Sequence, residues 1–309
     1  MRRRSFWVAL WALGLWPLTA VGGDLEQLGL RVRLVPGGAA AEIAPPAFPR
    51  PRPPPDALPD SRPGLGSWDI AEAWLVGPTT RYGHAVLGDA IEAGGLLVIL
   101  RDRRQIRYSL PDDAVFEDLQ PRVVDLDGDG REEVIVVRSS FGEGAALTVF
   151  EVTGGRLRLR AATSGIGLSY RWLNPIGVGD FDGDGWPEVA YVETPHIGGI
   201  LRVLRLSGDH FFELGRLSGF SNHALGSRRL GLSAILDLDG DGSDDLLVPD
   251  ALRRALRLVS FRHGHFSELG RVEHDAEIVT DLTVADRDGN GRADVAYGLA
   301  DGTLVELLR

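Results

Sequence analysis

Four copies of one short acidic loop constrain the fold of this chain more than any other feature of its sequence. They read DLDGDGREE at Asp125–Glu133, DFDGDGWPE at Asp180–Glu188, DLDGDGSDD at Asp237–Asp245 and DRDGNGRAD at Asp286–Asp294. Carboxylates at alternate positions of a tight, glycine-containing loop can converge on one point, and a hard cation such as Ca²⁺ takes about six to eight oxygen ligands. A phosphate would instead require backbone N–H groups and positive charge. The repeated spacing therefore predicts about four calcium sites.

Short apolar runs on both sides of each loop indicate its structural context. The runs VIVV, VAYV, LLVP and VAYG follow the four loops, and PRVV, IGVG, SAIL and LTVA precede them. Such β-branched or apolar runs predict buried strands. A helix–loop–helix calcium site would also need a bidentate Glu at loop position 12, where this chain has Val136, Tyr191, Val248 and Tyr297. The loops are therefore interpreted as strand–loop–strand sites.

The loops recur about every 50 residues, which is typical of a repeat built from four-stranded blades. The pattern resembles the FG-GAP (VCBS-type) repeats of β-propellers, known from integrin α-subunits and microbial lectins, in its bacterial exported form. The resemblance covers residues 83–309 and implies one calcium ion in each loop between the first and second strands of a blade. Carried over to this sequence, it assigns the metal ligands to side chains at loop positions 1, 3, 5 and 9 and to the backbone carbonyl at position 7. These residues are Asp125, Asp127, Asp129, Arg131, Glu133, Asp180, Asp182, Asp184, Trp186, Glu188, Asp237, Asp239, Asp241, Ser243, Asp245, Asp286, Asp288, Asn290, Arg292 and Asp294.

The order of apolar runs predicts an all-β fold, a β-propeller of five four-stranded blades. A weaker unit at His84–Leu100 keeps Asp89 but has apolar residues at other ligand positions, so we interpret it as a blade whose calcium site has decayed. The last repeat ends at TLVELLR, one strand short, and DIAEAWLV at Asp69–Val76 is expected to supply that strand. Ring closure by an N-terminal strand protects the sheet edges. Asn290 removes one charge from the fourth loop, which we expect to be the weakest site.

The N-terminal segment has the composition of an export signal. Arg2–Arg4 carries the only charges before Asp24, and the apolar run FWVALWALGLWPLTA follows it, with small residues near 20–23. This pattern is typical of a signal peptide, which we place at residues 1–23. The alternative is an uncleaved membrane anchor, because Ser5–Gly23 has no charge and could just span a bilayer. We expect a periplasmic or secreted protein with no membrane insertion after cleavage.

A proline-rich segment follows the signal. Ten of the chain's 18 prolines lie between Pro36 and Pro63, and such a segment behaves as a semi-rigid tether rather than as part of a core. We therefore assign residues 24–63 to a Pro-rich linker and residues 64–309 to the propeller.

Composition excludes several function classes. The chain has 44 acidic and 33 basic residues and a formal charge of −11, whereas nucleic-acid binding requires a basic face. It contains no cysteine, so it has no disulfide, thiolate metal site or thiol nucleophile.

The face of a propeller opposite the calcium loops carries the links between blades and the turns between second and third strands. Here these segments are TTRYGH, SYRWLNP, FSNHALGSRR and ETPHIGG, whose aromatic and planar hydrogen-bonding side chains suit a sugar or a peptide. In the alternative interpretation, Tyr82 and Trp172 wedge between blades and the histidines satisfy backbone groups. The candidate ligand-binding residues are Arg81, Tyr82, His84, Arg171, Trp172, His196, Asn222 and His223.

These observations favour an exported, calcium-stabilised binding module for a glycan or a protein partner. The alternatives are a polysaccharide lyase or hydrolase with its site at the channel mouth, and a scaffold of an envelope complex. Glycoside hydrolysis needs two acids facing each other across a cleft, but nearly all the clustered acids are assigned to metal. No catalytic residue is therefore assigned, and the sequence predicts no oligomeric state.

Overall fold

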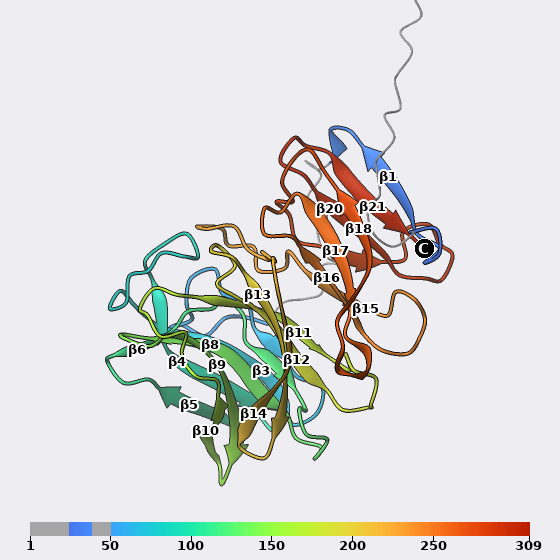
Figure 1. Ribbon diagram of the computed structural model, residues 1–309. Coiled ribbons are helices and arrows are strands. Elements are labelled where there is room, and N and C mark those ends of the chain that lie inside the picture. Colours follow the sequence, from blue (N-terminus) through green and yellow to red (C-terminus); the bar gives the residue numbers. More distant parts are fainter. Residues whose placement is uncertain (1–24, 39–50) are drawn as a thin grey trace, which may run out of the picture.

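The computed structural model describes residues 25–38 and 51–309, and it is built mainly from β-strands, with a short 3₁₀ turn, η2, at Arg262–Gly264. The predicted signal peptide lies outside the described residues. Among the residues described, no helix is long and apolar enough to cross a membrane. The all-β prediction is confirmed (Figure 1).

Five units of four strands, each strand antiparallel to its neighbour, account for most of the chain (Figure 1). We number them along the sequence. Unit 1 holds β2 (Gly64–Leu65), β3 (Ile70–Thr79), β4 (Glu92–Leu100) and β5 (Gln105–Ser109); unit 2 holds β7 (Arg122–Val124), β8 (Glu133–Ser140), β9 (Gly144–Thr153) and β10 (Arg156–Ala162); unit 3 holds β11 (Leu173–Gly179), β12 (Glu188–Glu193), β13 (Ile200–Ser207) and β14 (His210–Ser218); unit 4 holds β15 (Ala234–Leu236), β16 (Asp245–Pro249), β17 (Ala255–Ser260) and β18 (Ser267–Glu273); unit 5 holds β19 (Thr283–Ala285), β20 (Asp294–Gly298), β21 (Leu304–Leu308) and β1 (Arg31–Val35).

Units 3, 4 and 5 are separate sheets, whereas units 1 and 2 share one nine-stranded sheet. The short strand β6 (Ala114–Phe116) joins them, because it pairs with β4 on one side and with β8 on the other. Figure 1 shows the sheets of units 4 and 5 together at the upper right.

An N-terminal strand completes unit 5, but it is not the predicted one. β1 pairs antiparallel with β21 from Arg31 opposite Leu308 to Val35 opposite Leu304. The prediction for Asp69–Val76 was wrong, because this segment lies in and next to β3, whose register with β4 places Trp74 opposite Leu97. The long apolar β3 is buried between neighbours, whereas the sparsely buried RVRLV suits an outer edge.

The predicted linker also takes part in the fold. Leu25 and Leu30 are buried in the apolar cluster of units 4 and 5, and Leu58 is buried in the cluster around units 1 and 2. Ala57 forms an antiparallel bridge with Val76. The expectation that this segment holds no core residues is therefore wrong for the parts at 25–38 and 51–63. A few apolar residues among prolines are enough to anchor the chain.

The weak repeat unit is organised differently from the prediction. The segment His84–Leu100 does not contain a loop between first and second strands; it spans the end of a long β3–β4 connection and all of β4. The first-to-second-strand loop of unit 1 is the short stretch 66–69. The carboxylate of Glu132 accepts hydrogen bonds there from the backbone N–H groups of Trp68 (3.1 Å) and Ile70 (3.2 Å). A side chain from unit 2 thus caps this loop.

The apolar core lies largely between consecutive units. Phe116 and Phe150 pack edge to face in the cluster that joins units 1, 2 and 3, with ring centroids 5.7 Å apart. Phe181 and Phe261 lie in the cluster between units 3 and 4, and Tyr297 lies in that between units 4 and 5. Each fully buried side chain of this size contributes about 1.5–3 kcal/mol. Inter-unit packing therefore fixes where the loops at either end of the strands lie.

Candidate metal centres and the opposite face

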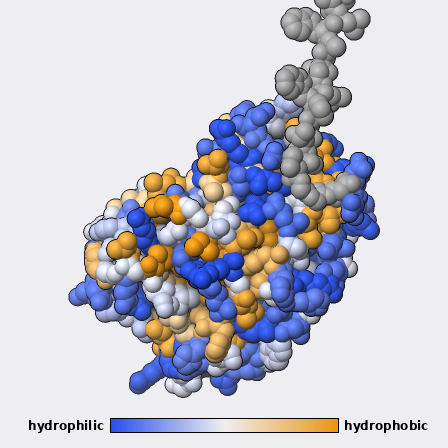
Figure 2. Space-filling view, in the orientation of Figure 1, coloured by the Kyte–Doolittle hydropathy of each residue, from blue (hydrophilic) through white to orange (hydrophobic). Residues whose placement is uncertain are grey.

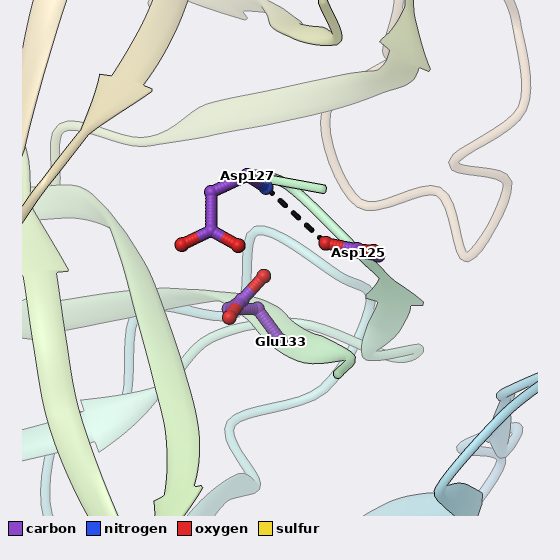
Figure 3. Close-up of side chains that lie close together, drawn as sticks. All are labelled: Asp125, Asp127 and Glu133. Carbon is purple, nitrogen blue, oxygen red and sulfur yellow. Dashed lines mark hydrogen bonds between the residues drawn. The ribbon is translucent and has the colours of Figure 1, made fainter. Parts of the chain in front are cut away.

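Each of the four acidic loops joins the first and second strands of its unit, as predicted. We call them loop 1 (125–133), loop 2 (180–188), loop 3 (237–245) and loop 4 (286–294). In every loop, one oxygen from each of the residues at positions 1, 3 and 9 lies within 4.8 Å of the others (Figure 3 shows loop 1). These groups are Asp125, Asp127 and Glu133; Asp180, Asp182 and Glu188; Asp237, Asp239 and Asp245; and Asp286, Asp288 and Asp294.

The same backbone hydrogen bonds shape all four loops. In loop 1, Asp125 accepts the N–H of Gly128 on Oδ1 (2.8 Å) and that of Gly130 on Oδ2 (3.0 Å), and the equivalent pairs recur in loops 2, 3 and 4. Both glycines have positive φ, 71° and 83°, which side chains with a Cβ rarely adopt. A carboxylate has about four lone-pair sites, so the bonded Asp125 can still bind a cation.

The acid at position 9 is buried at the start of the second strand. Glu133 is 2 % exposed, and its Oε2 accepts the N–H of Leu126 at 2.9 Å. The pKa of Glu133 is raised to about 7, mainly by burial and also by the nearby Asp127 and Asp129, while the Leu126 N–H and Arg160 oppose the shift. Burial likewise raises the pKa of Asp245 to about 7. Buried carboxylates crowded together in this way are relieved by a positive charge.

Loop 3 offers the clearest match to a bound cation. Asp245 is 1 % exposed, and its Oδ1 makes no hydrogen bond within the described residues. The hydroxyl of Ser260 lowers the pKa of Asp245 from nearby but does not meet it in hydrogen-bond geometry. The Ser243 hydroxyl in the same loop is also buried without a partner. Since all these donors are oxygens, the set fits a hard cation such as Ca²⁺.

The residues at loop position 5 have their own partners outside the three-acid groups. Asp184 pairs with Arg205, Asp241 with Arg262, and the Asn290 amide donates to the Arg309 carbonyl oxygen. The carboxylate of Asp129 accepts the N–H of Arg131. Of the four side-chain positions predicted to hold metal, the structure thus gathers three in every loop.

The comparison with protein families agrees with this geometry. Residues 125–191, which contain loops 1 and 2, match the family model of the FG-GAP-like repeat. No curated protein matches the chain.

Solved structures with a similar arrangement of strands include three rhamnogalacturonan lyases. The Bacillus licheniformis rhamnogalacturonan lyase PL11 is 18 % identical, with a TM-score of 0.42, and the match covers 66 % of this chain and 47 % of that one. The exotype lyase YesX is 16 % identical, with a TM-score of 0.44 and coverages of 79 % and 48 %. The lyase YesW is 17 % identical, with a TM-score of 0.41 and coverages of 67 % and 49 %. The chain therefore spans about half the length of these structures.

The end of the strands away from the acidic loops carries an aromatic cluster. Tyr82 is 3 % exposed, and its ring lies against His84, Phe141 and Tyr170 at centroid distances of 6.1, 5.1 and 5.1 Å. Its hydroxyl accepts the backbone N–H of Tyr170 at 2.8 Å. Phe141 and Tyr170 remain 46 % and 48 % exposed, so they form the accessible part of this cluster.

A second cluster contains Trp172, His196 and His223. The Trp172 and His196 rings stack with centroids 6.1 Å apart, and His223 meets Trp172 edge-on at 4.7 Å. His223 Nε2 lies 2.9 Å from the Ser227 carbonyl oxygen, so it carries the proton. His223 Nδ1 is then the acceptor of the 2.8 Å bond from His196 Nε2. Both histidines are neutral in this arrangement, and burial lowers the pKa of each to about 4.

A buried glutamate links the two clusters. Glu117 is 1 % exposed; its Oε1 lies 2.6 Å from His84 Nδ1, and its Oε2 accepts the Ser139 hydroxyl at 2.6 Å. Its backbone oxygen accepts the Trp172 indole N–H at 2.9 Å. The structure thus brings five predicted residues into one network: Tyr82, His84, Trp172, His196 and His223.

The remaining predicted ligand residues lie at the edge of this network or are committed elsewhere. Asn222 is fully buried. Its side-chain amide donates to the Asn174 backbone carbonyl oxygen, and the Asn174 side-chain amide donates to that of Asn222. The Arg81 guanidinium donates to the Ala114 carbonyl oxygen. Arg171 is half-buried. Glu117, Phe141 and Tyr170 were missed by sequence reasoning, although Tyr170 lies within the quoted segment SYRWLNP. Its position in this link between units 2 and 3 was the sequence signal that could have identified Tyr170.

Proposed function

We propose that this is an exported, calcium-stabilised β-propeller that binds a glycan or a protein partner. The observation that carries the proposal is the recurrence of one three-acid group in all four loops, two of which lie in the segment that matches the FG-GAP-like repeat. Calcium bound in such a loop would hold the first and second strands of its blade together. The ion would supply positive charge, and the carboxylates of the loop would hold it.

The five four-stranded units support five blades. The link that follows unit 3 reaches back to unit 1, where the Gly226 N–H donates to the Val86 carbonyl oxygen (2.9 Å) and Arg228 pairs with Asp60 and Asp89. The chain therefore curves enough to bring units 1 and 4 toward a common axis. A compact domain of this size has a radius of gyration near 19 Å, and we expect about this value if the ring is closed. Small-angle X-ray scattering measures this value, and a clearly larger one would contradict closure.

The exposed aromatic rings opposite the loops support ligand binding. Tyr170 and Phe141 present flat apolar faces beside the polar network of His84 and Glu117, and such surfaces suit sugars and peptides. Figure 2 shows that apolar patches interrupt the hydrophilic surface on the face in view. Trp172 is 2 % exposed, so it would support the site from beneath.

A polysaccharide lyase or hydrolase is the second candidate. The contact between His84 and the buried Glu117 favours it, because a carboxylate that orients an imidazole is a common device of general bases. Glu117 itself is buried and committed to His84 and Ser139. Binding therefore remains the leading proposal, with catalysis to be tested by product release from any glycan that binds.

The test is glycan-array binding of the full chain in calcium, with Tyr170→Ala beside it. The matched control is Phe212→Ala, which changes an exposed ring on β14. We expect hits that disappear in Tyr170→Ala and persist in Phe212→Ala. A blank array from folded, calcium-loaded protein would contradict the glycan and direct the search to a protein partner by pull-down.

A further inference from the structure

We infer that the four loops divide into two kinds: loops 1 and 2 receive their positive charge from an arginine of the same sheet, and loops 3 and 4 receive it from a bound divalent cation. This inference rests on the proposed calcium binding and refines it. The loops share their backbone geometry, so the difference lies in the side chains that face them.

In loop 1 the guanidinium of Arg160, from β10, bridges two acids of the group. Its Nη1 donates to Glu133 Oε1 at 2.7 Å, and its Nη2 donates to Asp127 Oδ2 at 2.5 Å. The Arg160 side chain is only 9 % exposed. A guanidinium held by two carboxylates in a partly buried site makes strong charge-assisted bonds. Arg160 thus bonds the oxygens that a cation would need.

In loop 2 an arginine from a different strand of its sheet bonds the acids. Arg205, on β13, donates through Nε to Glu188 Oε1 at 2.9 Å and through Nη2 to Asp182 Oδ2 at 2.9 Å. Its Nη1 donates to Asp184 Oδ2 at 2.7 Å. Three of the four predicted side-chain ligands of loop 2 are therefore bonded to one arginine. A divalent cation would have to displace this guanidinium, because two positive charges at one point repel.

In loop 3 the corresponding place has no arginine. Register decides the equivalence: Arg205 follows Leu204, which pairs with Val189 just after Glu188, and Ser260 follows Val259, which pairs with Leu246 just after Asp245. Ser260 therefore stands in unit 4 where Arg205 stands in unit 3. The nearby Arg262 reaches only Asp241, and Asp245 Oδ1 stays buried without a partner. The lack of an equivalent arginine and this unpaired buried oxygen both indicate that loop 3 binds a cation.

In loop 4 the same register leads to Leu308. It follows Leu307, which pairs with Val295 just after Asp294, and a leucine brings no charge. Arg287 lies within loop 4, yet its guanidinium bonds Glu306 rather than the three acids. The Asp294 oxygens accept the backbone N–H groups of Arg287 and Arg309. Arg33 lies near Asp288 and Asp294 but pairs with Glu306. No guanidinium within the described residues bonds the three acids of loop 4.

The experiment counts calcium ions bound by the metal-free full chain, using isothermal titration and equilibrium dialysis. We expect two ions for the natural chain, three for Arg205→Ser, which gives loop 2 the side chain found at that place in unit 4, and one for Ser260→Arg. Affinities of about 10⁻⁴–10⁻³ M are typical of extracellular calcium modules. Because Ser260 is 3 % exposed, the larger arginine can disturb folding, so Arg205→Ser carries the test alone if Ser260→Arg does not fold.

Terbium gives a loop-specific second readout, because Trp186 occupies position 7 of loop 2 and lies against Gly128 of loop 1. We expect little tryptophan-sensitised terbium emission from the natural chain and at least a several-fold increase in Arg205→Ser. Four ions in the natural chain, or an unchanged count in Arg205→Ser, would overturn the division of loops while leaving calcium binding intact. A folded chain that binds no ion would overturn both.

Discussion

The loops at the two ends of the strands differ in how regular they are. At the acidic end, one pattern of Asp, Gly and buried acid builds the same turn four times, down to the two backbone bonds that the first Asp accepts. At the opposite, irregular end, each connection has its own length and contents; Tyr82 and Trp172 are buried there, whereas Phe141 and Tyr170 are exposed. Trp172 there is 2 % exposed, whereas Trp186 in loop 2 is 53 % exposed. The repeated loops therefore join the strands of each sheet in the same way, whereas the variable connections at the opposite end can form a surface specific to one ligand.

The largest expected difference between the two ends is in stability, and the two tryptophans measure it. Trp172→Ala removes a buried ring that stacks on His196 and bonds Glu117, which should cost about 3–5 kcal/mol. Trp186→Ala removes a ring that is half in solvent and should change the free energy of unfolding by about 0.5 kcal/mol or less. Urea unfolding of both variants checks the pair. Similar losses would mean that the two ends are equally packed.

Calcium should act only at the acidic end. An ion present at about 100 times its dissociation constant adds about 2.7 kcal/mol per site, so the natural chain should melt higher in calcium than in EGTA. Asp245→Asn should reduce this gain, because it weakens the buried ligand of loop 3. Asp112→Asn is the control, since this exposed acid pairs with Arg81 at the other end. Equal melting in calcium and EGTA would contradict calcium binding by loops 3 and 4.

The contrast also explains what could be predicted from the sequence. A fixed spacing of Asp and Gly flanked by apolar runs reports both the turn and the strands, so the loops and the first and second strands of units 2 to 5 were predicted well. Residues at positions 1, 3 and 9 do converge. Arg160 and Arg205, however, reach the loops from strands far along the chain. Only the register of the folded sheets shows that Arg205 and Ser260 are equivalent.

The missed features share another physical cause. β1 and the unit 1 loop at 66–69 depend on partners more than 60 residues away, such as Leu308 for Arg31 and Glu132 for Trp68. Local propensity says little about such pairing. For Tyr82 and Trp172, aromatic character suggests a ligand platform as readily as a core, and tertiary packing buries both. Sequence alone left that choice open.

Acid should weaken the irregular end by a smaller amount for each histidine that titrates. Burial lowers the pKa of both His196 and His223 to about 4; Arg253 and His84 add to the shift of His196, and His196 and Arg253 add to that of His223. An unfolded histidine titrates near 6.5. Between these values the unfolded chain binds more protons than the folded one, so the free energy of unfolding falls as the pH falls from about 6.5 to 4. For each histidine of the pair, the free energy of unfolding should fall by about 2 kcal/mol between pH 7 and pH 5.

Urea unfolding at pH 7 and pH 5 in His223→Gln measures this effect against the natural chain. The variant should be less stable at pH 7, because it loses ring packing on Trp172, but its stability should depend less on pH in this range. His263→Gln is the matched control: this histidine is exposed in η2, on the turn between β17 and β18, and should leave the pH dependence unchanged. If His223→Gln kept the full loss toward pH 5, the acid sensitivity would lie elsewhere, and the neutral His196–His223 bond would not be what couples the irregular end to pH.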